Sequence, residues 1–558
     1  MNLASPTVTK WVEDGLADPE AFWARAAQEL PWFRTWDRVY EAAPPTFRWF
    51  IGAQTNIAHN ALDHHVADGR GDRNALIYFN ERGDEVTYTY AELLALVERT
   101  AEVLISSGAC CEDRVVVWGP NSIDWAVAAL AVTYAGAVLV PVNSRYVGAE
   151  VADVVERTQA PLVVVQDGFL GRDQVGELHE AGVDPQRILP LDRLMDAAAR
   201  AEGMSHEGTD PDDVADILFT SGTTGRSKGA MSAHRQSIGV ARAWAELGGV
   251  RQDDRYLVVN PFFHSFGYKI GILVGLLTGA TLYPMATFDL DETMRLIEDE
   301  RITVLPGAPT IYQSLLAAPG REQRDLSSLR LAVTGAAVVP VVLIERMRAA
   351  APEGLGIDQV VTAFGMTEAV VVTMAREGDP ADLVASTCGR AIPGMETRIL
   401  DPGEDGSGEL LVRGDFVMLG YLDDPEATAE AIDSDGWLHT GDVGVLDDAG
   451  NLRITDRLKD MYISGGFNVY PAEVEQSLMR LEGLADVAVV GVPDERMGEV
   501  GKAFVVRADS PAGEALTADD VTAFAREHLA NFKVPRQVEF TGALPRNLSG
   551  KVLKKDLR

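Results

Sequence analysis

A loop rich in glycine and hydroxyl side chains follows an apolar strand in the first half of the chain. Residues 217–230 read ILFTSGTTGRSKGA, so that the loop ahead of Lys228 offers Thr220, Ser221, Gly222, Thr223 and Thr224. Glycine lets the backbone approach phosphate oxygens, hydroxyls donate hydrogen bonds, and a lysine neutralises charge. The order of Gly, Lys and Ser differs from that of the Walker P-loop. This composition favours a phosphate-binding loop over an ordinary surface loop.

Four further motifs follow in order: Phe364-Gly-Met-Thr-Glu368, Thr440-Gly-Asp442, residues 456–471 (DRLKDMYISGGFNVYP) and Pro545-Arg-Asn-Leu-Ser-Gly-Lys551. Together with the loop they resemble the acyl-adenylate-forming superfamily, which contains acyl-CoA synthetases, firefly luciferase and peptide-synthetase adenylation domains. Thr-Gly-Asp alone would carry almost no weight. Five motifs in the right order, spread from about residue 70 to the C-terminus, are jointly very specific.

The resemblance implies an acid–thiol ligase that uses ATP, Mg²⁺ and coenzyme A. A carboxylate would attack the α-phosphate of ATP, so charge has to be stabilised on phosphorus and on the leaving pyrophosphate. The loop hydroxyls and Lys228 would hold the β- and γ-phosphates, Thr367 the α-phosphate, and Glu368 with Thr223 the Mg²⁺ ion. Asp442 would accept the ribose hydroxyls, assisted by Arg457. Adenine would lie between Phe364-Gly365-Met366 and a second wall formed by Gly335, Ala336 and Ala337.

The same resemblance assigns the C-terminal motifs to movement and transfer. Lys551 would bridge the carboxylate and α-phosphate oxygens during adenylation. Lys459 matches the hinge about which the small domain rotates between the two half-reactions. After rotation, Ser464, Gly465 and Gly466 would line the path of the coenzyme A thiol.

Residues 260–269, NPFFHSFGYK, resemble the segment that lines the acyl pocket in this superfamily. His264 would gate the carboxylate, and the pocket would be lined by Phe263, Gly267, Tyr268, Ala336, Ala363 and Val370. The segment is similar to ligases for ring-bearing acids from steroid breakdown, which favours a bulky alicyclic, aromatic or medium-chain acid. Residues 22–64 resemble instead the N-terminal extension of acetyl-CoA synthetases. His64 and His65 suit a structural role better than a metal site.

Other functions compete with this interpretation. A stand-alone enzyme could load the acyl group onto a carrier protein, or the chain could perform the thioester half-reaction alone. A luciferase-type oxygenase has no positive support. A non-catalytic nucleotide sensor is disfavoured, because Lys228, Glu368, Asp442 and Lys551 are all present.

The elements that must position these residues indicate an α/β fold. Apolar strands are predicted at residues 115–118, 162–165, 217–220, 256–260, 304–306 and 331–334, with helices such as 124–134 and 290–300 between them. This alternation favours layers of mostly parallel sheet. Turns at 401–408 and 447–450 indicate a small antiparallel β subdomain. A helix from Pro471, strands at 487–492 and 503–506, and a capping box at Thr517 predict a separate, small α+β domain. The resemblance implies that this domain is mobile.

Three domains are therefore expected: an N-terminal extension at 1–65, an adenylate-forming domain at 66–457 and a C-terminal domain at 458–558. The net charge of −35 disfavours binding to nucleic acid or an anionic membrane surface. No apolar run is suited to a membrane span, and no secretory signal is evident. Three cysteines cannot form a disulfide framework, so a cytoplasmic protein is expected. The expected partners are a small carboxylic acid, ATP and coenzyme A, with a homodimer left open.

Overall fold

The computed structural model describes the chain apart from residues 1–13, 16, 29, 44–45, 80–84, 206–207, 221–226, 336–338, 340, 404, 458–459, 465–466, 470, 495–496, 530, 547–551 and 558. The chain divides into two compact units. The first comprises Met1–Arg242, Phe262–Ala286 and Met418–Leu422. The second comprises Ala243–Pro261, Thr287–Val417 and Asp423–Arg558.

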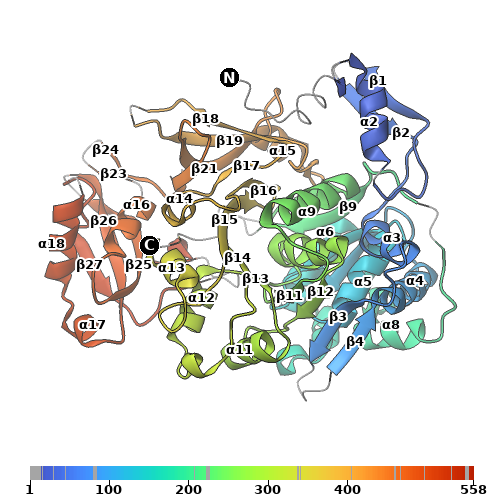
Figure 1. Ribbon diagram of the computed structural model, residues 1–558, viewed down its shortest axis with the longest axis horizontal. Helices are drawn as coiled ribbons and strands as arrows, with labels where there is room; N and C mark the ends of the chain where they lie inside the picture. The colour runs from blue at the N-terminus through green and yellow to red at the C-terminus, as the bar shows by residue number, and fades with distance from the viewer. Residues whose placement is uncertain are drawn as a thin grey trace. The chain divides into compact units, whose positions relative to one another are not determined.

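A seven-stranded sheet forms the centre of the first unit (Figure 1). Its strand order is β20 (Gly420–Tyr421), β10 (Gly229–Ala233), β9 (Val214–Phe219), β6 (Val138–Val142), β5 (Arg114–Trp118), β7 (Leu162–Val165) and β8 (Ile188–Pro190). The strands from β9 to β8 are parallel, and β10 and β20 add an antiparallel edge. Strands β5, β6 and β7 consist mostly of valine and leucine, as parallel strands buried on both faces require.

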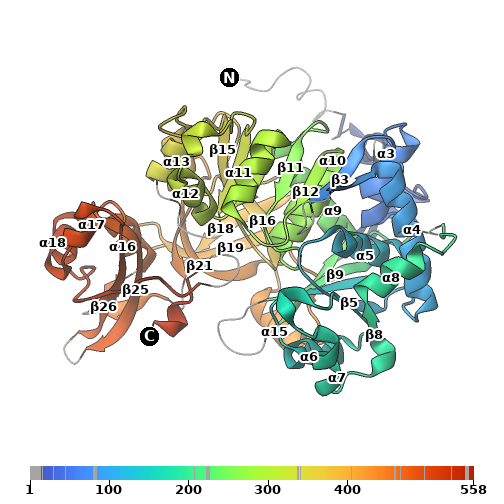
Figure 2. The same cartoon turned by 90° about the horizontal axis from the view of Figure 1, so that it is seen from below.

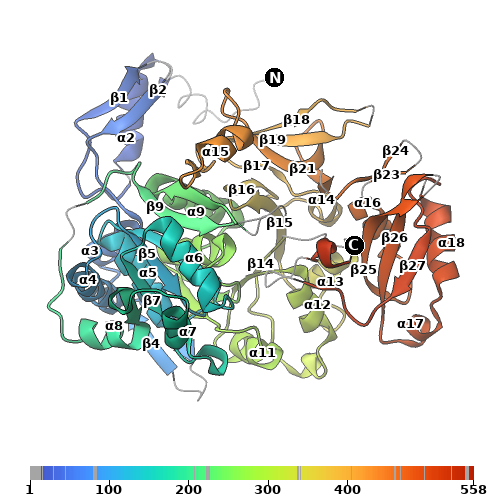
Figure 3. The same cartoon turned by 180° about the vertical axis from the view of Figure 1, so that it is seen from behind.

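Helices cover this sheet, and their ends follow the sequence signals. The helices of the first unit are α2 (Pro19–Ala27), α3 (His64–Ala67), α4 (Tyr90–Ser106), α5 (Ile123–Tyr134), α6 (Gly148–Thr158), α7 (Gln174–Glu180), α8 (Leu191–Ala198), most of α9 (His234–Gly248) and α10 (Val274–Thr278). Thr89 and Glu92 form a capping box at the start of α4. Helices α4, α5 and α8 pack together (Figure 3).

Three further strands and a hairpin complete the first unit. Strand β3 (Asn74–Phe79) pairs parallel with β12 (Thr281–Pro284) and antiparallel with β4 (Glu85–Thr89). The hairpin of β1 (Arg38–Ala43) and β2 (Thr46–Ile51) was not expected from the sequence. Two segments are π-helical, His59–Asp63 and Phe266–Leu273. π-Helical turns are rare and are often found at functional sites.

The second unit contains three sheets. The first has the order β17 (Arg390–Ala391), β16 (Ala369–Met374), β15 (Gln359–Met366), β14 (Leu331–Gly335), β13 (Val304–Gly307) and β11 (Arg255–Val258). It carries the helices α11 (Leu290–Asp299), α12 (Pro309–Ala317), α13 (Val341–Arg348) and α14 (Ala381–Ser386). The second is antiparallel, in the order β18 (Met395–Leu400), β19 (Gly408–Gly414), β21 (Leu438–Leu446) and β22 (Leu452–Arg457), with α15 (Pro425–Ala431) beside it. The predicted β subdomain is this second sheet.

The third sheet belongs to the C-terminal segment and has its own core. It consists of β24 (Phe467–Val469), β23 (Tyr462–Ser464), β26 (Gly498–Arg507) and β25 (Leu484–Asp494), with β27 (Gln537–Phe540) parallel to β26. Helices α16 (Pro471–Leu478) and α18 (Ala518–His528) pack on one face of the sheet (Figure 2), and α17 spans Pro511–Ala515. The predicted helix at Pro471 and the capping box of Thr517 with Asp520 are confirmed.

Candidate active site

Strands β9 and β10 form the base of the predicted phosphate-binding loop. Phe219 pairs with Gly229 across the two strands. The amide of Thr220 donates a hydrogen bond of 2.8 Å to the Lys228 carbonyl, and the Lys228 amide donates to the Thr220 hydroxyl at 3.4 Å. Ser221, Gly222, Thr223 and Thr224 lie outside the described residues. The two ends of the loop are therefore held together by the β9–β10 pairing, and Lys228 directly precedes β10.

The aromatic ring of Tyr421 holds the Lys228 ammonium. The Nζ atom lies 4.8 Å from the centroid of the ring. Tyr421 is in place because β20 pairs with β10, an arrangement extended by Leu422 N–H donating to the Gly229 carbonyl at 2.8 Å. A cation over an aromatic face is attracted by the ring quadrupole. Tyr421 therefore restrains the lysine that the sequence assigns to phosphate binding.

We expect Tyr421→Leu to lower kcat/KM for ATP about 2- to 5-fold, because the cation–π contact contributes about 0.5–1 kcal/mol. Tyr421→Phe keeps the ring and is the matched control. It should retain nearly the wild-type value. Steady-state kinetics with varied ATP measure both variants, and equal losses in the two would contradict a role for the ring.

The segment that carries His264 is anchored at both ends. The Phe262 amide donates to the Asn121 side-chain oxygen at 2.7 Å, and the amides of Gly267 and Tyr268 each donate to the His264 carbonyl at 2.9 Å. The Phe266 amide donates to His264 Nδ1 at 3.1 Å. Nδ1 is thus an acceptor, so the neutral imidazole carries its proton on Nε2. Burial lowers the pKa of His264, which favours this neutral form.

His264 should stay neutral at ordinary assay pH. Its pKa is lowered, so protonation begins only below its usual value of 6.5, and protonation at Nδ1 would break the bond from Phe266. We expect kcat/KM for the acid to show an acid limb below pH 6.5 that is absent in His264→Phe. A pH–rate profile of both enzymes tests this. An inflection above pH 6.5 that disappears in the variant would show a raised pKa instead.

Aromatic rings pack beside this segment in the first unit. The ring of Trp125 on α5 lies 5.3 Å from Phe262 and 6.4 Å from Tyr268, measured between centroids. Tyr268 is fully buried, and its hydroxyl has no hydrogen-bond partner among the described residues. Burial raises the pKa of Tyr268, with the Asp216 carboxylate adding to the shift. Phe263, Gly267 and Tyr268 thus come from one short stretch, which begins the π-helical turn.

In the second unit, Thr367 and Glu368 form the two-residue turn of the β15–β16 hairpin. Met366 pairs with Ala369 on either side of them. Gly365 is required there, because a Cβ atom at this position would lie 2.0 Å from the Val370 carbonyl oxygen. Gly335 at the end of β14 pairs with Ala363 on β15. The hairpin therefore brings Gly335, Ala363, Phe364 and the two turn residues to one edge of the sheet.

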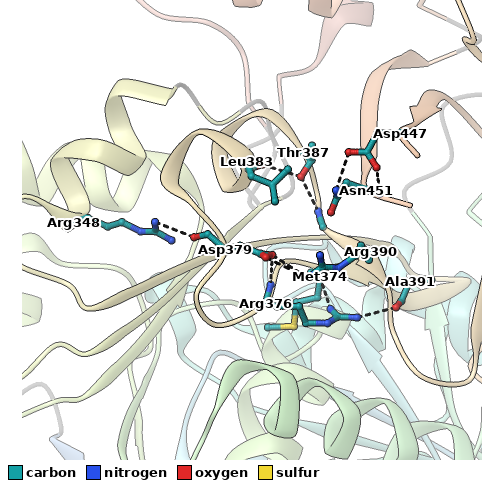
Figure 4. A network of polar contacts seen from close by, with 11 residues as sticks. Arg348, Met374, Arg376, Asp379, Leu383, Thr387, Arg390, Ala391, Asp447 and Asn451 are labelled. Carbon is teal, nitrogen blue, oxygen red and sulfur yellow. Dashed lines mark hydrogen bonds and ion pairs between the residues drawn. The ribbon is translucent and has the colours of Figure 1, made fainter. Parts of the chain in front are cut away.

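Polar contacts centred on Asp379 brace the other end of this hairpin (Figure 4). The Arg376 amide donates to Asp379 Oδ2 at 2.7 Å, and Arg390 forms an ion pair with Asp379 at 3.2 Å. Arg376 also donates to the Ala391 carbonyl at 2.9 Å. These bonds, some of them charge-assisted, tie β17 to the segment that follows β16.

The Thr440-Gly-Asp442 motif is a bulge within β21. The Thr440 hydroxyl donates to the Leu410 carbonyl at 2.7 Å and accepts from the Asp442 amide at 3.1 Å. Gly441 has a φ of +68°, which favours glycine, and its amide donates to Glu409 at 3.2 Å. The motif therefore sets the direction of the Asp442 carboxylate, which is 4% exposed.

Asp442 and Glu368 have the chemistry expected of a nucleotide site. Asp442 is a buried acceptor whose backbone pairs with that of Arg457 on β22. It also lies close to Cys388: burial raises the pKa of that thiol to about 11, and the Asp442 charge contributes. An anionic acceptor suits a pair of ribose hydroxyls. Glu368, 9% exposed at a turn, offers carboxylate oxygens of the kind that Mg²⁺ prefers.

Several predicted site residues cannot be placed. Ala336, Ala337, Lys459, Gly465, Gly466 and Lys551 lie outside the described residues, and of Arg457 the backbone alone is described. Ser464 ends β23, is 3% exposed, and pairs with Phe467 and Gly498. Val370 follows the turn on β16.

The pair His64 and His65 opens α3, and His65 contacts a backbone carbonyl. His65 Nε2 lies 2.7 Å from the Leu276 carbonyl. Burial lowers the pKa of His64 to about 4 and that of His65 to about 3. Among the residues with described positions, no group of three or more His, Cys, Asp or Glu side chains could hold a metal ion.

Sequence reasoning missed three features of the site: the Tyr421 contact, the π-helical turn, and an ion pair between Lys269 and Asp216 in the first unit. A signal for the ion pair existed. Lys269 and Asp216 are opposite charges, each set in an otherwise apolar run.

None of the helices that the structure describes could span a membrane.

Comparison with known families gives three matches. Residues 63–422 match the AMP-binding enzyme family, and residues 473–551 match the AMP-binding enzyme C-terminal domain. Residues 9–61 match the acetyl-coenzyme A synthetase N-terminus. The three matched segments follow one another along the chain.

Two curated relatives share more than half of their aligned residues with this chain. One from Rhodococcus jostii (strain RHA1) is 55% identical over 495 residues, covering 85% of this chain and 94% of the relative. One from Mycobacterium tuberculosis (strain ATCC 25618 / H37Rv) is 53% identical over 506 residues, covering 87% and 96%. Both are named 3-[(3aS,4S,7aS)-7a-methyl-1,5-dioxo-octahydro-1H-inden-4-yl]propanoyl:CoA ligase. Among solved structures, ATP-bound MatB from Rhodopseudomonas palustris is similar, with a TM-score of 0.81, 31% identity, and coverage of 90% of this chain and 98% of MatB.

Proposed function

The chain belongs to the AMP-binding enzyme family, and from that membership we propose that it joins a bulky alicyclic carboxylic acid to coenzyme A through an acyl-adenylate. The class of reaction is that of an AMP-forming acid–thiol ligase, which consumes ATP and releases pyrophosphate. The observation that supports the acid most strongly is the identity of 55% and 53% to two ligases named for a fused-ring propanoyl substrate.

We propose that the chain binds ATP through polar groups at loop and hairpin turns. Lys228 and the hydroxyls of the 220–224 loop bind the β- and γ-phosphates, and Thr367 donates to the α-phosphate. Asp442 accepts from the ribose hydroxyls, with Arg457 beside it in the β21–β22 pairing. The backbone around Gly365, where a side chain would strike the Val370 carbonyl, forms one wall of the proposed adenine site. Preformed donors of this kind stabilise developing charge without reorganising during the reaction.

Glu368, with Thr223, would hold Mg²⁺, which neutralises charge on the phosphates when it is bound. The buried position of Glu368 in a tight turn supports this role. Lys551 contributes the remaining positive charge, between the carboxylate and the α-phosphate. His264, neutral and with Nε2–H free to donate, orients the carboxylate.

The acid itself would contact the aromatic stretch that follows Pro261. Phe263, Gly267 and Tyr268 provide apolar surface, and the buried Tyr268 hydroxyl is a donor for an oxygen on the acid. A buried hydroxyl without a partner costs about 1–3 kcal/mol, so an acceptor on the substrate would be favoured. Ala363 and Val370 are the further residues proposed for this pocket.

For the second half-reaction, we propose rotation about Lys459 that brings Ser464, Gly465 and Gly466 to the coenzyme A thiol. The proposed domains are 1–65, 66–457 and 458–558. The separate hydrophobic core of the C-terminal sheet supports independent movement of this domain. A cytoplasmic location is supported by three cysteines that are all free thiols.

The acid preference is tested by measuring kcat/KM with ATP and coenzyme A for four acids: acetate, octanoate, ferulate and a dioxo-octahydroindenyl propanoate. We expect the fused-ring acid to exceed acetate and octanoate by at least about 10²-fold, since several buried methylenes each contribute to binding. A preference for acetate would overturn the alicyclic assignment and leave the reaction class intact.

A further inference from the structure

Lys269 and Asp216 form an ion pair inside the first unit. Their side chains are 1% and 0% exposed, and Lys269 Nζ lies 2.9 Å from Asp216 Oδ1. Two hydroxyls complete the network. Lys269 Nζ donates to Ser232 Oγ at 2.8 Å, and Ser237 Oγ donates to Asp216 Oδ2 at 2.7 Å. By comparison, the Arg330–Asp254 pair leaves its arginine 20% exposed.

The four residues come from four elements that meet at the proposed site. Asp216 is on β9, which leads into the phosphate-binding loop, and Ser232 is on β10, which leaves it. Ser237 is in the first turn of α9. Lys269 is on the π-helical turn Phe266–Leu273, which begins two residues after His264. One ammonium group therefore connects the acid-binding segment to both strands of the phosphate hairpin.

Stability alone does not account for such a pair. Taking two charges out of water is costly, and apolar side chains of similar volume are usually as stable or more so. Neighbours such as Ala215, Ile217 and Ile270 are already buried and apolar, so a wholly apolar core was available at this place. Apolar contacts are non-directional and do not fix the relative orientation of two elements. Here the charge-assisted hydrogen bonds from Lys269 to Ser232 and from Ser237 to Asp216 have fixed geometry, and the ion pair links the two bonds, so that neighbouring elements are held in one register.

We propose that the Lys269–Asp216 pair is a positioning device, which fixes the π-helical turn after His264 against the stem of the phosphate-binding loop. This rests on the proposed function, because it supposes that His264 orients the acid and that the loop binds ATP. Adenylation requires the carboxylate and the α-phosphate in attacking geometry, and a displacement of about 1 Å can cost about 10²-fold in rate. Lys269 and Asp216 are thus positioning residues that contact neither substrate.

The test separates positioning from stability with a charge-neutral double variant. Lys269→Met alone leaves a buried, unpaired carboxylate, and we expect the Tm to fall by roughly 5 °C or more. Asp216→Asn/Lys269→Met removes both charges and keeps an acceptor for Ser237. We expect its Tm to return to within about 2 °C of wild type. We expect its adenylation kcat to stay at least about 10-fold low, with KM for ATP and acid within about 3-fold of wild type.

Arg330→Met is the matched control, since it breaks the Arg330–Asp254 pair outside these elements. It should lower the Tm and leave the adenylation kcat unchanged. Ser232→Ala is a second, milder variant in case the double variant fails to fold. Losing one bond to Lys269 should lower kcat about 3-fold with little change in Tm.

A double variant that regains the wild-type rate along with its Tm would overturn the proposal, as would a rise in KM with kcat unchanged. If the double variant does not fold, a wild-type kcat in Ser232→Ala has the same meaning. These results are distinct from failure of the proposed function. If the proposed function fails, the wild-type enzyme forms neither AMP nor thioester with any acid tested, whatever the variants do.

Discussion

Replacing Lys551 with alanine is expected to slow acyl-adenylate formation by about 10²–10³-fold, the usual effect of removing one group that stabilises transition-state charge. Thioester formation from a supplied acyl-adenylate should change less than about 3-fold, because the α-phosphate has by then already been attacked. The measurement is a pair of single-turnover assays, one started with acid and ATP and the other with synthetic acyl-adenylate and coenzyme A.

Lys555→Ala is the matched control for this prediction. Lys555 lies in the same C-terminal stretch and is exposed. Its removal should leave both half-reactions near their wild-type rates, because a solvated surface charge contributes little. An equal loss of both half-reactions in Lys551→Ala would refute a role confined to adenylation. A loss shared with Lys555→Ala would indicate a general effect of net charge.

Replacing Asp442 with alanine is expected to weaken ATP binding strongly. A hydrogen bond to a charged group contributes about 1.5–3 kcal/mol, and Asp442 is proposed to accept two of them from the ribose. We therefore expect KM for ATP to rise about 10²-fold or more. KM for the acid should change little. Kinetics with ATP varied at saturating acid measure the first, and the reverse titration measures the second.

Asp448→Ala on the same β21–β22 hairpin is the control for Asp442. Asp448 lies in the exposed turn between the two strands. It should leave KM for ATP within about 2-fold of wild type, since exposed single substitutions seldom perturb a distant site. A similar KM for Asp442→Ala and Asp448→Ala would remove Asp442 from the nucleotide site.

Sequence reasoning worked best where a motif coincides with local chemistry. The Phe364–Glu368 run became a hairpin whose turn is Thr367 and Glu368, as its single glycine and short polar end allow. Strand β9 and the helix at Pro471 followed from apolar runs and from a proline with nearby acids at a helix start. These are local signals, and they survive folding because tertiary contacts agree with them.

The features that sequence reasoning missed depend on residues far apart in the chain. Tyr421 meets Lys228 through the pairing of β20 with β10, which no local pattern announces. Lys269 and Asp216 meet through a π-helical turn, and its extra residue per turn is invisible to a test for helical periodicity. The β1–β2 hairpin carries aromatic residues such as Tyr40 and the exposed Trp49, and their spacing resembles neither a buried strand nor a helix.

Mass spectrometry of the products shows whether the protein ligates an acid to coenzyme A with formation of AMP. The purified protein is incubated with ATP, Mg²⁺, coenzyme A and the dioxo-octahydroindenyl propanoate, and a parallel reaction omits coenzyme A. We expect one acyl-CoA per AMP in the full reaction, and enzyme-bound acyl-adenylate in the reaction without coenzyme A. Formation of ADP in place of AMP, or of adenylate that coenzyme A never discharges, would contradict it.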